Sequence, residues 1–178
     1  TFYYEEELMD LRRFLKRLEE VGELKTIPEE THWSLEVAAL CAMTNRVGGP
    51  ALLFPKVKGY PPGYGLAGSL LTGPGTMFYR ERTPWGRIAV ALGLDKGISY
   101  EELMEELIER RQHPIHPLRV STGPCKEVVA RGREADLFSL PFPYLYEGDG
   151  GRYGTSQVFI VKDPEMDWVH WGGYNFML

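Results

Sequence analysis

The segment from Gly123 to Tyr174 constrains the fold most, because it alternates short β-prone runs with turn residues at close intervals. Runs rich in branched and aromatic residues predict strands over 118–121, 126–131, 155–162 and 168–176. Glycine or proline marks the predicted turns at 131–132, 148–151 and 163–164. Consecutive antiparallel strands are therefore expected in the last third of the chain.

The first two thirds of the chain are dominated by helical patterns. Leucines at three- and four-residue spacing predict a helix over 5–21, which Gly22 would end in a left-handed conformation. Further helices are predicted to begin near residues 31 or 34, 83 and 99, and short strands over 23–28 and 51–57. Helices with a few strands, followed by antiparallel strands, indicate the α+β class and not a doubly wound sheet.

A proline-broken run, His113-Pro-Ile-His-Pro117, is interpreted as a linker. The expected domains are an N-terminal α/β domain over 1–116 and the start of a β domain over 117–178. Both His113 and His116 are interpreted as linker residues and not as metal ligands. The sequence has no Gly-x-Gly-x-x-Gly and no Gly-x-x-x-x-Gly-Lys, so a nucleotide cradle of those kinds is not predicted.

Composition and charge exclude several classes of protein. Hydrophobic residues make up 43% of the 178 residues, which is enough for a packed core. The net charge of -5 argues against nucleic-acid binding, which relies on a basic surface. No apolar run approaches the roughly 20 residues of a membrane span. The two cysteines form no Cys-x-x-Cys pair, which favours a reduced cytoplasmic protein.

Four motifs of the last third occur in a fixed order before a tryptophan-rich strand. They are Gly-Pro-Cys-x-Glu-Val-Val, Asp-Leu-x-x-Leu-Pro-x-Pro, Glu-Gly-Asp-Gly-Gly-Arg-Tyr and Lys-Asp-Pro. In this order the chain resembles the UbiD family of decarboxylases (3-octaprenyl-4-hydroxybenzoate carboxy-lyase-like). The resemblance implies an N-terminal α/β domain followed by a flavin-binding split β-barrel, of which this chain holds the first strands. It also implies self-association.

The activity that the resemblance implies is reversible, non-oxidative decarboxylation of aromatic or α,β-unsaturated carboxylic acids. The implied cofactors are prenylated FMN, a divalent Mn-type ion and, in addition, a monovalent cation. Full-length members of the family are far longer, so the chain is expected to be an N-terminal portion that is inactive alone. The family's acid–base residues would then lie beyond Leu178 or on a partner chain.

The last strand carries the candidate metal and catalytic positions. In the resembled family this strand reads Trp-x-Asn, and an Arg follows five residues after the Asn. The resemblance implies that the Asn helps to hold the metal ion and that the Arg faces the substrate carboxylate. Here Trp168 matches, His170 stands at the Asn position and Asn175 at the Arg position. Neutral imidazole is a sensible metal ligand, although a structural or surface histidine is an equal alternative. Asn cannot grip a carboxylate through two charge-assisted hydrogen bonds, so the family role is not transferred to Asn175.

The candidate cofactor-binding residues lie on the last two predicted strands. They are Ser156, Trp171, Gly172 and Gly173. Both glycines match positions where the family's backbone approaches the flavin, and they also supply the bend that His170 and Asn175 would need to meet one cofactor. Ser156 is equally an ordinary polar strand residue. The glycine-rich turn over 147–153 is interpreted as a hairpin turn in which Gly150 and Gly151 can take positive φ, with phosphate binding as the alternative.

Two other functional hypotheses follow from the same residues. A non-catalytic subunit that docks on a longer decarboxylase chain would tolerate the changes at positions 170 and 175. A simple flavin-binding or flavin-reductase module is less favoured, because too few strands are present. The aromatic residues of the last third are interpreted as the core of the β domain, with the wall of an aromatic pocket as the alternative. They are Tyr144, Tyr146, Tyr153, Trp168, Trp171 and Tyr174.

Overall fold

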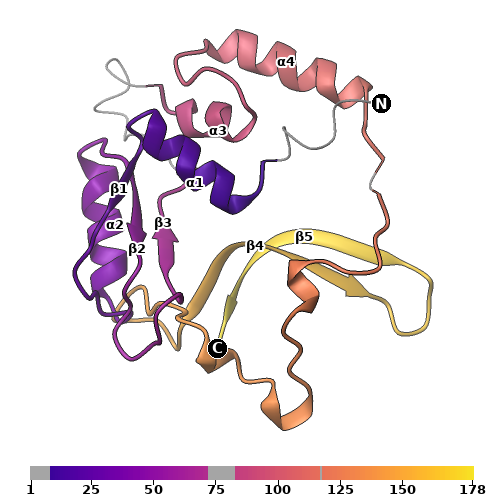
Figure 1. The fold of residues 1–178 in the computed structure, drawn as a ribbon. Coiled ribbons are helices and arrows are strands. Elements are labelled where there is room, and N and C mark those ends of the chain that lie inside the picture. Colours follow the sequence, from indigo (N-terminus) through magenta and orange to yellow (C-terminus); the bar gives the residue numbers. More distant parts are fainter. Residues whose placement is uncertain (1–8, 72–82, 117) are drawn as a thin grey trace. The chain divides into compact units, whose positions relative to one another are not determined.

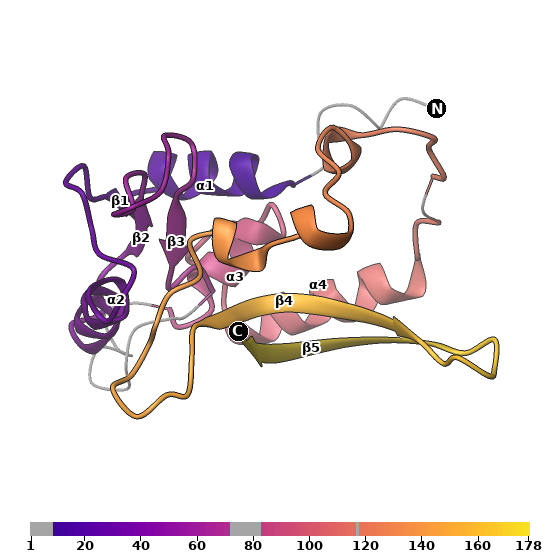
Figure 2. The same ribbon diagram turned by 90° about the horizontal axis from the view of Figure 1, so that it is seen from below.

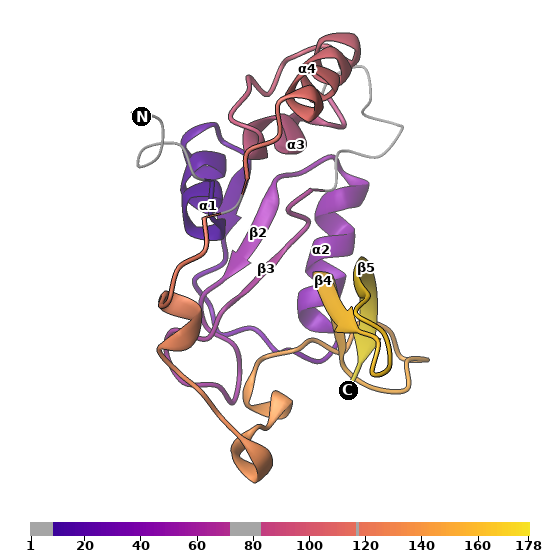
Figure 3. The same cartoon turned by 90° about the vertical axis from the view of Figure 1, so that its right-hand side faces the viewer.

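The computed structural model describes residues 9–71, 83–116 and 118–178 (Figure 1). Its helices are α1 (Leu11–Glu20), α2 (Glu36–Arg46), α3 (Gly86–Ala91) and α4 (Tyr100–Gln112). Its strands are β1 (Leu24–Thr26), β2 (Ala51–Phe54), β3 (Leu66–Gly68), β4 (Tyr153–Lys162) and β5 (Val169–Met177). One sheet has the order β1-β2-β3, with β2 and β3 side by side in Figure 3, and the other pairs β4 with β5. The fold is thus a mixture of helices and small sheets.

The chain divides into two compact units that are not continuous in sequence. The first unit comprises residues 1–25, 43–52 and 69–136. The second unit comprises residues 26–42, 53–68 and 137–178. The candidate residues on β4 and β5 all belong to the second unit.

Helix ends in the first unit follow local sequence signals. The Asp10 carboxylate accepts a hydrogen bond from Arg13 N at 2.8 Å and begins α1, and Gly22 with φ of 74° ends it as expected. At α4, Ser99 Oγ accepts from Glu102 N, and the Glu102 carboxylate accepts from Ser99 N. The hydrogen bonds to Ser99 hold the pKa of Glu102 below its ordinary value.

The apolar core of the first unit forms where α1, β2 and α3 meet. Phe14 and Leu18 of α1, Ala51 of β2 and Val90 of α3 are buried against one another. Because α1 presents its apolar residues at helical spacing, one face packs inward while its arginines stay outside. This unit therefore buries its apolar side chains through contacts within itself.

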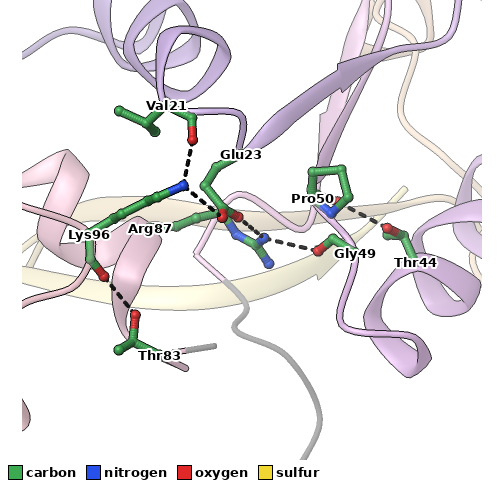
Figure 4. A network of polar contacts seen from close by, with 8 residues as sticks. All are labelled: Val21, Glu23, Thr44, Gly49, Pro50, Thr83, Arg87 and Lys96. Carbon is green, nitrogen blue, oxygen red and sulfur yellow. Dashed lines mark hydrogen bonds and ion pairs between the residues drawn. The ribbon is translucent and has the colours of Figure 1, made fainter. Parts of the chain in front are cut away.

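A buried ion pair lies beside this core (Figure 4). Arg87 Nη1 lies 3.2 Å from Glu23 Oε2 and donates to Gly49 O at 3.1 Å. Lys96 Nζ donates to Val21 O at 2.6 Å and lies 3.8 Å from Glu23 Oε1. The guanidinium and carboxylate are almost fully removed from water, so Arg87, the nearer and buried cation, is the main partner that compensates the charge of Glu23, with the partly exposed Lys96 as a second one.

The second unit buries a separate set of residues around the start of α2. They are Thr31, Val37, Phe54 and Val57. Thr31 forms a parallel bridge with Val57, and the backbone of Tyr144 donates to Trp33 O and accepts from Leu35 N. These bonds hold the segment that leads into β4.

Two of the predicted strands are wrong. The ranges 118–121 and 126–131 form bends and a 3₁₀ turn at Pro124–Lys126, and no strand lies between residues 118 and 136. Val120 and Val129 are exposed, and Val128 is 86% exposed. Valine favours a strand only where a partner strand and a packed face are present, and neither occurs among the described residues of this segment.

The β4–β5 hairpin as a candidate cofactor and metal site

Strands β4 and β5 form a long antiparallel hairpin (Figure 2). The predicted turn is confirmed, since Asp163 Oδ1 accepts from the backbone N–H groups of Glu165 and Met166, each at 2.8 Å. Residues directly opposite one another share a face, and successive residues alternate between the faces. We name the tryptophan face by its residues Val158, Ile160, Trp171, Gly173 and Asn175. The histidine face carries Phe159, Val161, His170, Gly172, Tyr174 and Phe176.

The pairing register does not shift at the two glycines of β5, and the irregularity lies on the other strand. Pairing is regular from Gln157 opposite Tyr174 to Lys162 opposite Val169. The register shifts between Gly154 and Gln157, so that Thr155 and Ser156 together oppose Asn175 as a β-bulge.

His170 and Asn175 consequently stay on opposite faces. The bulge instead brings the backbone of Ser156 to the level of Asn175. The Ser156 side chain lies outside what the structure describes. Gln157 Nε2 donates to Gly154 O at 2.7 Å and to Tyr174 O at 2.8 Å, which closes the gap that the extra residue opens.

His170 is half-buried between the ring of Trp168, which immediately precedes β5, and the ring of Tyr174 within β5. Its Nε2 lies 2.9 Å from the Tyr174 hydroxyl, and its ring stacks on Trp168 with centroids 5.5 Å apart and planes at 22°. Within the described part of the chain, no three His, Cys, Asp or Glu residues gather into a metal-binding group. His170 can therefore provide one nitrogen ligand but not a complete metal site.

The two candidate glycines have different surroundings. A Cβ at Gly172 would collide with the Tyr174 ring and lie 2.8 Å from His170 Nε2. A Cβ at Gly173 would meet no atom within 4 Å. The position at Gly173 is therefore open, beside the exposed Trp171, whereas the space at Gly172 is filled by the side chains of Tyr174 and His170.

The glycine-rich turn uses its glycines for close approach and not for positive φ. Neither Gly150 nor Gly151 has a left-handed φ, which corrects the expectation for these residues. A Cβ at Gly151 would collide with Leu178 O, and one at Gly150 would lie 3.1 Å from Met177 Sδ. Tyr146 N donates to Asp149 Oδ2 at 2.9 Å, so the turn closes on itself. The turn leads into β4 and does not join two paired strands, so the interpretation as a hairpin turn is wrong; the hairpin turn of this sheet lies between β4 and β5.

Arg152 anchors this turn within the second unit. Its guanidinium lies 3.6 Å from the Trp33 ring centroid and 5.4 Å from that of Phe138, and it hydrogen-bonds the Tyr60 hydroxyl. Leu178 N donates to Arg152 O at 2.9 Å, so the anchor also holds the end of β5. These contacts hold the residues just before β4 and just after β5, and the sequence motifs alone did not reveal them.

Several aromatic residues of the last third are not core residues, contrary to expectation. Tyr146 is 69% exposed, Trp168 57%, Trp171 66% and Tyr174 54%. Sequence reasoning missed the contact of Tyr174 with His170, because strand residues four apart do not normally touch. The signal was Gly172, which stands between two large side chains on the same face.

Fold and motifs together define the class of the protein. Residues 15–107 match the family model of the 3-octaprenyl-4-hydroxybenzoate carboxy-lyase N-terminal domain, and residues 117–178 match that of its Rift-related domain. These matches cover most of the chain, which therefore belongs to the UbiD family.

Individual relatives agree with this assignment. The chain is 33% identical over 167 residues to ferulic acid decarboxylase 1 of Saccharomyces cerevisiae, covering 92% of this chain and 33% of that protein. It is similar to the closed form of vanillic acid decarboxylase from Sedimentibacter hydroxybenzoicus, with a TM-score of 0.80, 28% identity and coverage of 98% and 36%. An evolved dimeric form of the UbiD-class enzyme HmfF from Pelotomaculum thermopropionicum, in complex with prFMN, gives a TM-score of 0.69, 28% identity and coverage of 94% and 35%.

The chain spans about a third of the length of the curated relatives that it matches. None of the helices in the described ranges combines the length and apolar character that crossing a membrane requires. The residues that the resemblance implied for the flavin and the metal ion lie on both faces of one hairpin, and they do not converge on a single point.

Proposed function

We propose that the whole protein is a UbiD-family decarboxylase that uses prenylated FMN to remove CO₂, reversibly and without net oxidation, from aromatic or α,β-unsaturated carboxylic acids. The observation that carries this proposal is the match of both family domains, in the family's order, along one chain. Relatives named as decarboxylases of ferulic and phenolic acids support the substrate class, and the HmfF structure with prFMN supports the cofactor.

The tryptophan face is the proposed flavin surface. Gly173 leaves open space there, and Trp171 and Ile160 add exposed apolar area on which a planar ring can rest. Ser156, in the bulge of β4, is the proposed hydrogen-bond partner of the flavin on this surface. When bound, prenylated FMN supplies an electrophilic centre that stabilises the charge left on an sp² carbon after loss of CO₂. Gly172 is assigned to the internal packing of His170 and Tyr174 and not to the flavin contact.

His170 is the proposed ligand that this chain contributes to a divalent Mn-type ion. An imidazole nitrogen suits such an ion, and the two flanking rings restrict the ring's orientation. A monovalent cation belongs to the same proposal. We assign the remaining metal ligands and the acid–base residues to other parts of the protein or to a partner chain, since no three His, Cys, Asp or Glu residues gather into a metal-binding group in the described ranges.

The hairpin is proposed to be the opening pair of a flavin-binding split β-barrel in a cytoplasmic homo-oligomer. A two-stranded ribbon is marginally stable alone, and apolar residues on both of its faces are exposed. Covering these faces by further strands of the same protein or by a partner chain would remove that apolar surface from water.

Asn175 motivates a second candidate function. At the position of the family's arginine, Asn175 provides hydrogen bonds but no positive charge for a substrate carboxylate. Either the carboxylate is bound by other groups, or this module no longer catalyses and instead docks on a longer decarboxylase chain.

The test is CO₂ release by the protein from its complete reading frame, co-expressed with a flavin prenyltransferase. The substrate panel comprises hydroxybenzoic, cinnamic-type and heteroaromatic carboxylic acids, and exchange of labelled bicarbonate into the acid measures the reverse reaction. Preparations with unmodified FMN are the control. CO₂ release that depends on prenylated FMN is expected. Absence of release, together with co-purification of a longer decarboxylase chain, would contradict the enzyme and favour the docking module.

A further inference from the structure

Helix α4 carries an exposed apolar stripe on an otherwise charged surface. The helix is fixed to the first unit by Leu103, which is 3% exposed, and by the hydrogen bond that Arg110 Nη1 donates to Leu92 O at 2.8 Å. The stripe lies beside this buried edge, and its residues follow one another at four-residue spacing, which places them on one side of the helix. They are Tyr100, Met104 and Ile108, with exposed fractions of 52%, 37% and 56%. The stripe is therefore accessible to another molecule.

The charged residues of α4 divide into two groups. The first group is already paired within the helix and its caps: Glu102 with Ser99, Glu106 with Arg110, and Glu109 with His113. In contrast, Glu101, Glu105 and Arg111 form no hydrogen bond or ion pair with any residue that the structure describes. By helical spacing, Glu101 and Glu105 border the first half of the stripe, and Arg111 lies at its end. The two carboxylates are four residues apart and repel each other.

The stripe is consequently complementary in charge to a second copy of itself. Two α4 helices packed antiparallel about a twofold axis place Met104 of one against Ile108 of the other. The same arrangement places Arg111 of each helix beside Glu101 of the other. In a parallel pair, the acidic ends would lie together and the arginines would lie together, and both contacts would be repulsive. Antiparallel pairing thus covers the apolar residues and pairs the charges that are left over on each helix.

We propose that α4 is a surface through which two copies of this protein associate, with their α4 helices antiparallel about a twofold axis. The inference rests on the homo-oligomer of the proposed function and names a contact surface for it. Helix α4 has 13 residues and is about 20 Å long. One helix pair buries less than the roughly 800 Å² per partner of a standard interface, so association of micromolar strength is expected at this surface.

Sedimentation equilibrium of the complete protein across micromolar concentrations measures each association step. Ile108→Glu places a charge in the apolar contact and should weaken one step at least tenfold. Glu101→Arg and Arg111→Glu each replace two attractions by two repulsions and should weaken the same step about tenfold. The matched control is Glu109→Arg, which makes the same charge change as Glu101→Arg but lies about 140° around the helix from Met104. This control should associate as the wild type does, and circular dichroism checks that each variant is folded.

A mixture of two variants is the most specific arm of the experiment. Alone, Glu101→Arg and Arg111→Glu each bring like charges together at both ends of the helix pair. When the two variants are mixed, opposite charges meet at both ends, so the wild-type dissociation constant should be recovered. The orientation is tested by oxidation of Met104→Cys mixed with Ile108→Cys. Disulfides should join position 104 of one chain to position 108 of the other, since antiparallel pairing brings these positions together.

An assembly that is unchanged in Ile108→Glu and in both charge variants would overturn the α4 surface without contradicting the homo-oligomer. An equal weakening in Glu109→Arg would also overturn it, because the effect would then be one of net charge. A wild-type protein that is monomeric at every concentration would contradict both the surface and the homo-oligomer, and would leave the stripe to a different protein. CO₂ release is measured separately, so the proposed decarboxylase activity is tested independently of this surface.

Discussion

The first unit and the β4–β5 hairpin use their apolar residues in opposite ways. In the first unit, Leu18 of α1 and Val90 of α3 are buried in one apolar cluster. The buried ion pair of Arg87 and Glu23 lies beside that cluster. In the hairpin, Val158, Ile160 and Trp171 are exposed on one face, and Tyr174 is exposed on the other. Since burial of apolar area is the main stabilising contribution to folding, the first unit is stabilised by its own contacts and the hairpin has surface left for a ligand or further chain.

Arg87→Met should have the largest effect, because it leaves the Glu23 carboxylate buried without its guanidinium partner. We expect a loss of about 3–5 kcal/mol in the free energy of unfolding, measured by urea denaturation. The matched control is Arg17→Met, which breaks an exposed pair with Glu20 and should cost about 0–1 kcal/mol. Equal effects of the two substitutions would contradict the described burial of the first pair.

Leu18→Ala should be next, since Leu18 is fully buried and its removal leaves a cavity. The expected loss is about 2–5 kcal/mol in the same measurement. Val158→Ala on the exposed tryptophan face should change stability by about 0.5 kcal/mol or less. A large cost at Val158 would mean that the hairpin face is already covered, which would erase the contrast between the two regions.

Ser99→Ala tests the capping of α4 and should cost about 1 kcal/mol. The same change should raise the pKa of Glu102, because its hydrogen bonds to Ser99 lower that pKa in the folded protein. A carboxyl with a depressed folded pKa stabilises the protein above its unfolded pKa, and that contribution is lost as pH falls through the folded pKa. In Ser99→Ala, the free energy of unfolding should therefore fall less as the pH is lowered than it does in the wild type. An NMR titration of Glu102 that is identical in the two proteins would contradict this expectation.

Gly172→Ala and Gly173→Ala should have the smallest effects on stability, each within about 1 kcal/mol. Their local effects should differ, because a methyl group at position 172 displaces the Tyr174 ring, while one at position 173 meets no neighbour. Nuclear Overhauser contacts between His170 and Tyr174 should vanish only in Gly172→Ala. Loss of these contacts in both variants would argue against the distinct faces of β5.

Local signals in the sequence were sufficient for much of the fold. The cap at Ser99, the left-handed Gly22 and the turn at Asp163 depend on neighbouring residues only, and each was correctly predicted. The strands expected around Val120 and Val128 do not form, because β-propensity needs a partner strand.

The candidate site was less predictable for a related reason. The motif identified His170, Gly172 and Gly173, but the pairing register assigns them to two faces, and register is a property of both strands. The bulge opposite Asn175 and the contact of His170 with Tyr174 likewise depend on side-chain packing that linear spacing does not encode.

We propose that this chain is part of a decarboxylase that holds prenylated FMN against the tryptophan face. Native mass spectrometry of the complete protein, co-expressed with a flavin prenyltransferase, tests it most directly, with Gly173→Trp as the variant that fills the open space. The wild type should carry one flavin and a divalent metal ion per subunit, and Gly173→Trp should lose the flavin while remaining folded. A wild-type protein without flavin, or full flavin occupancy in Gly173→Trp, would show that the tryptophan face does not bind the cofactor.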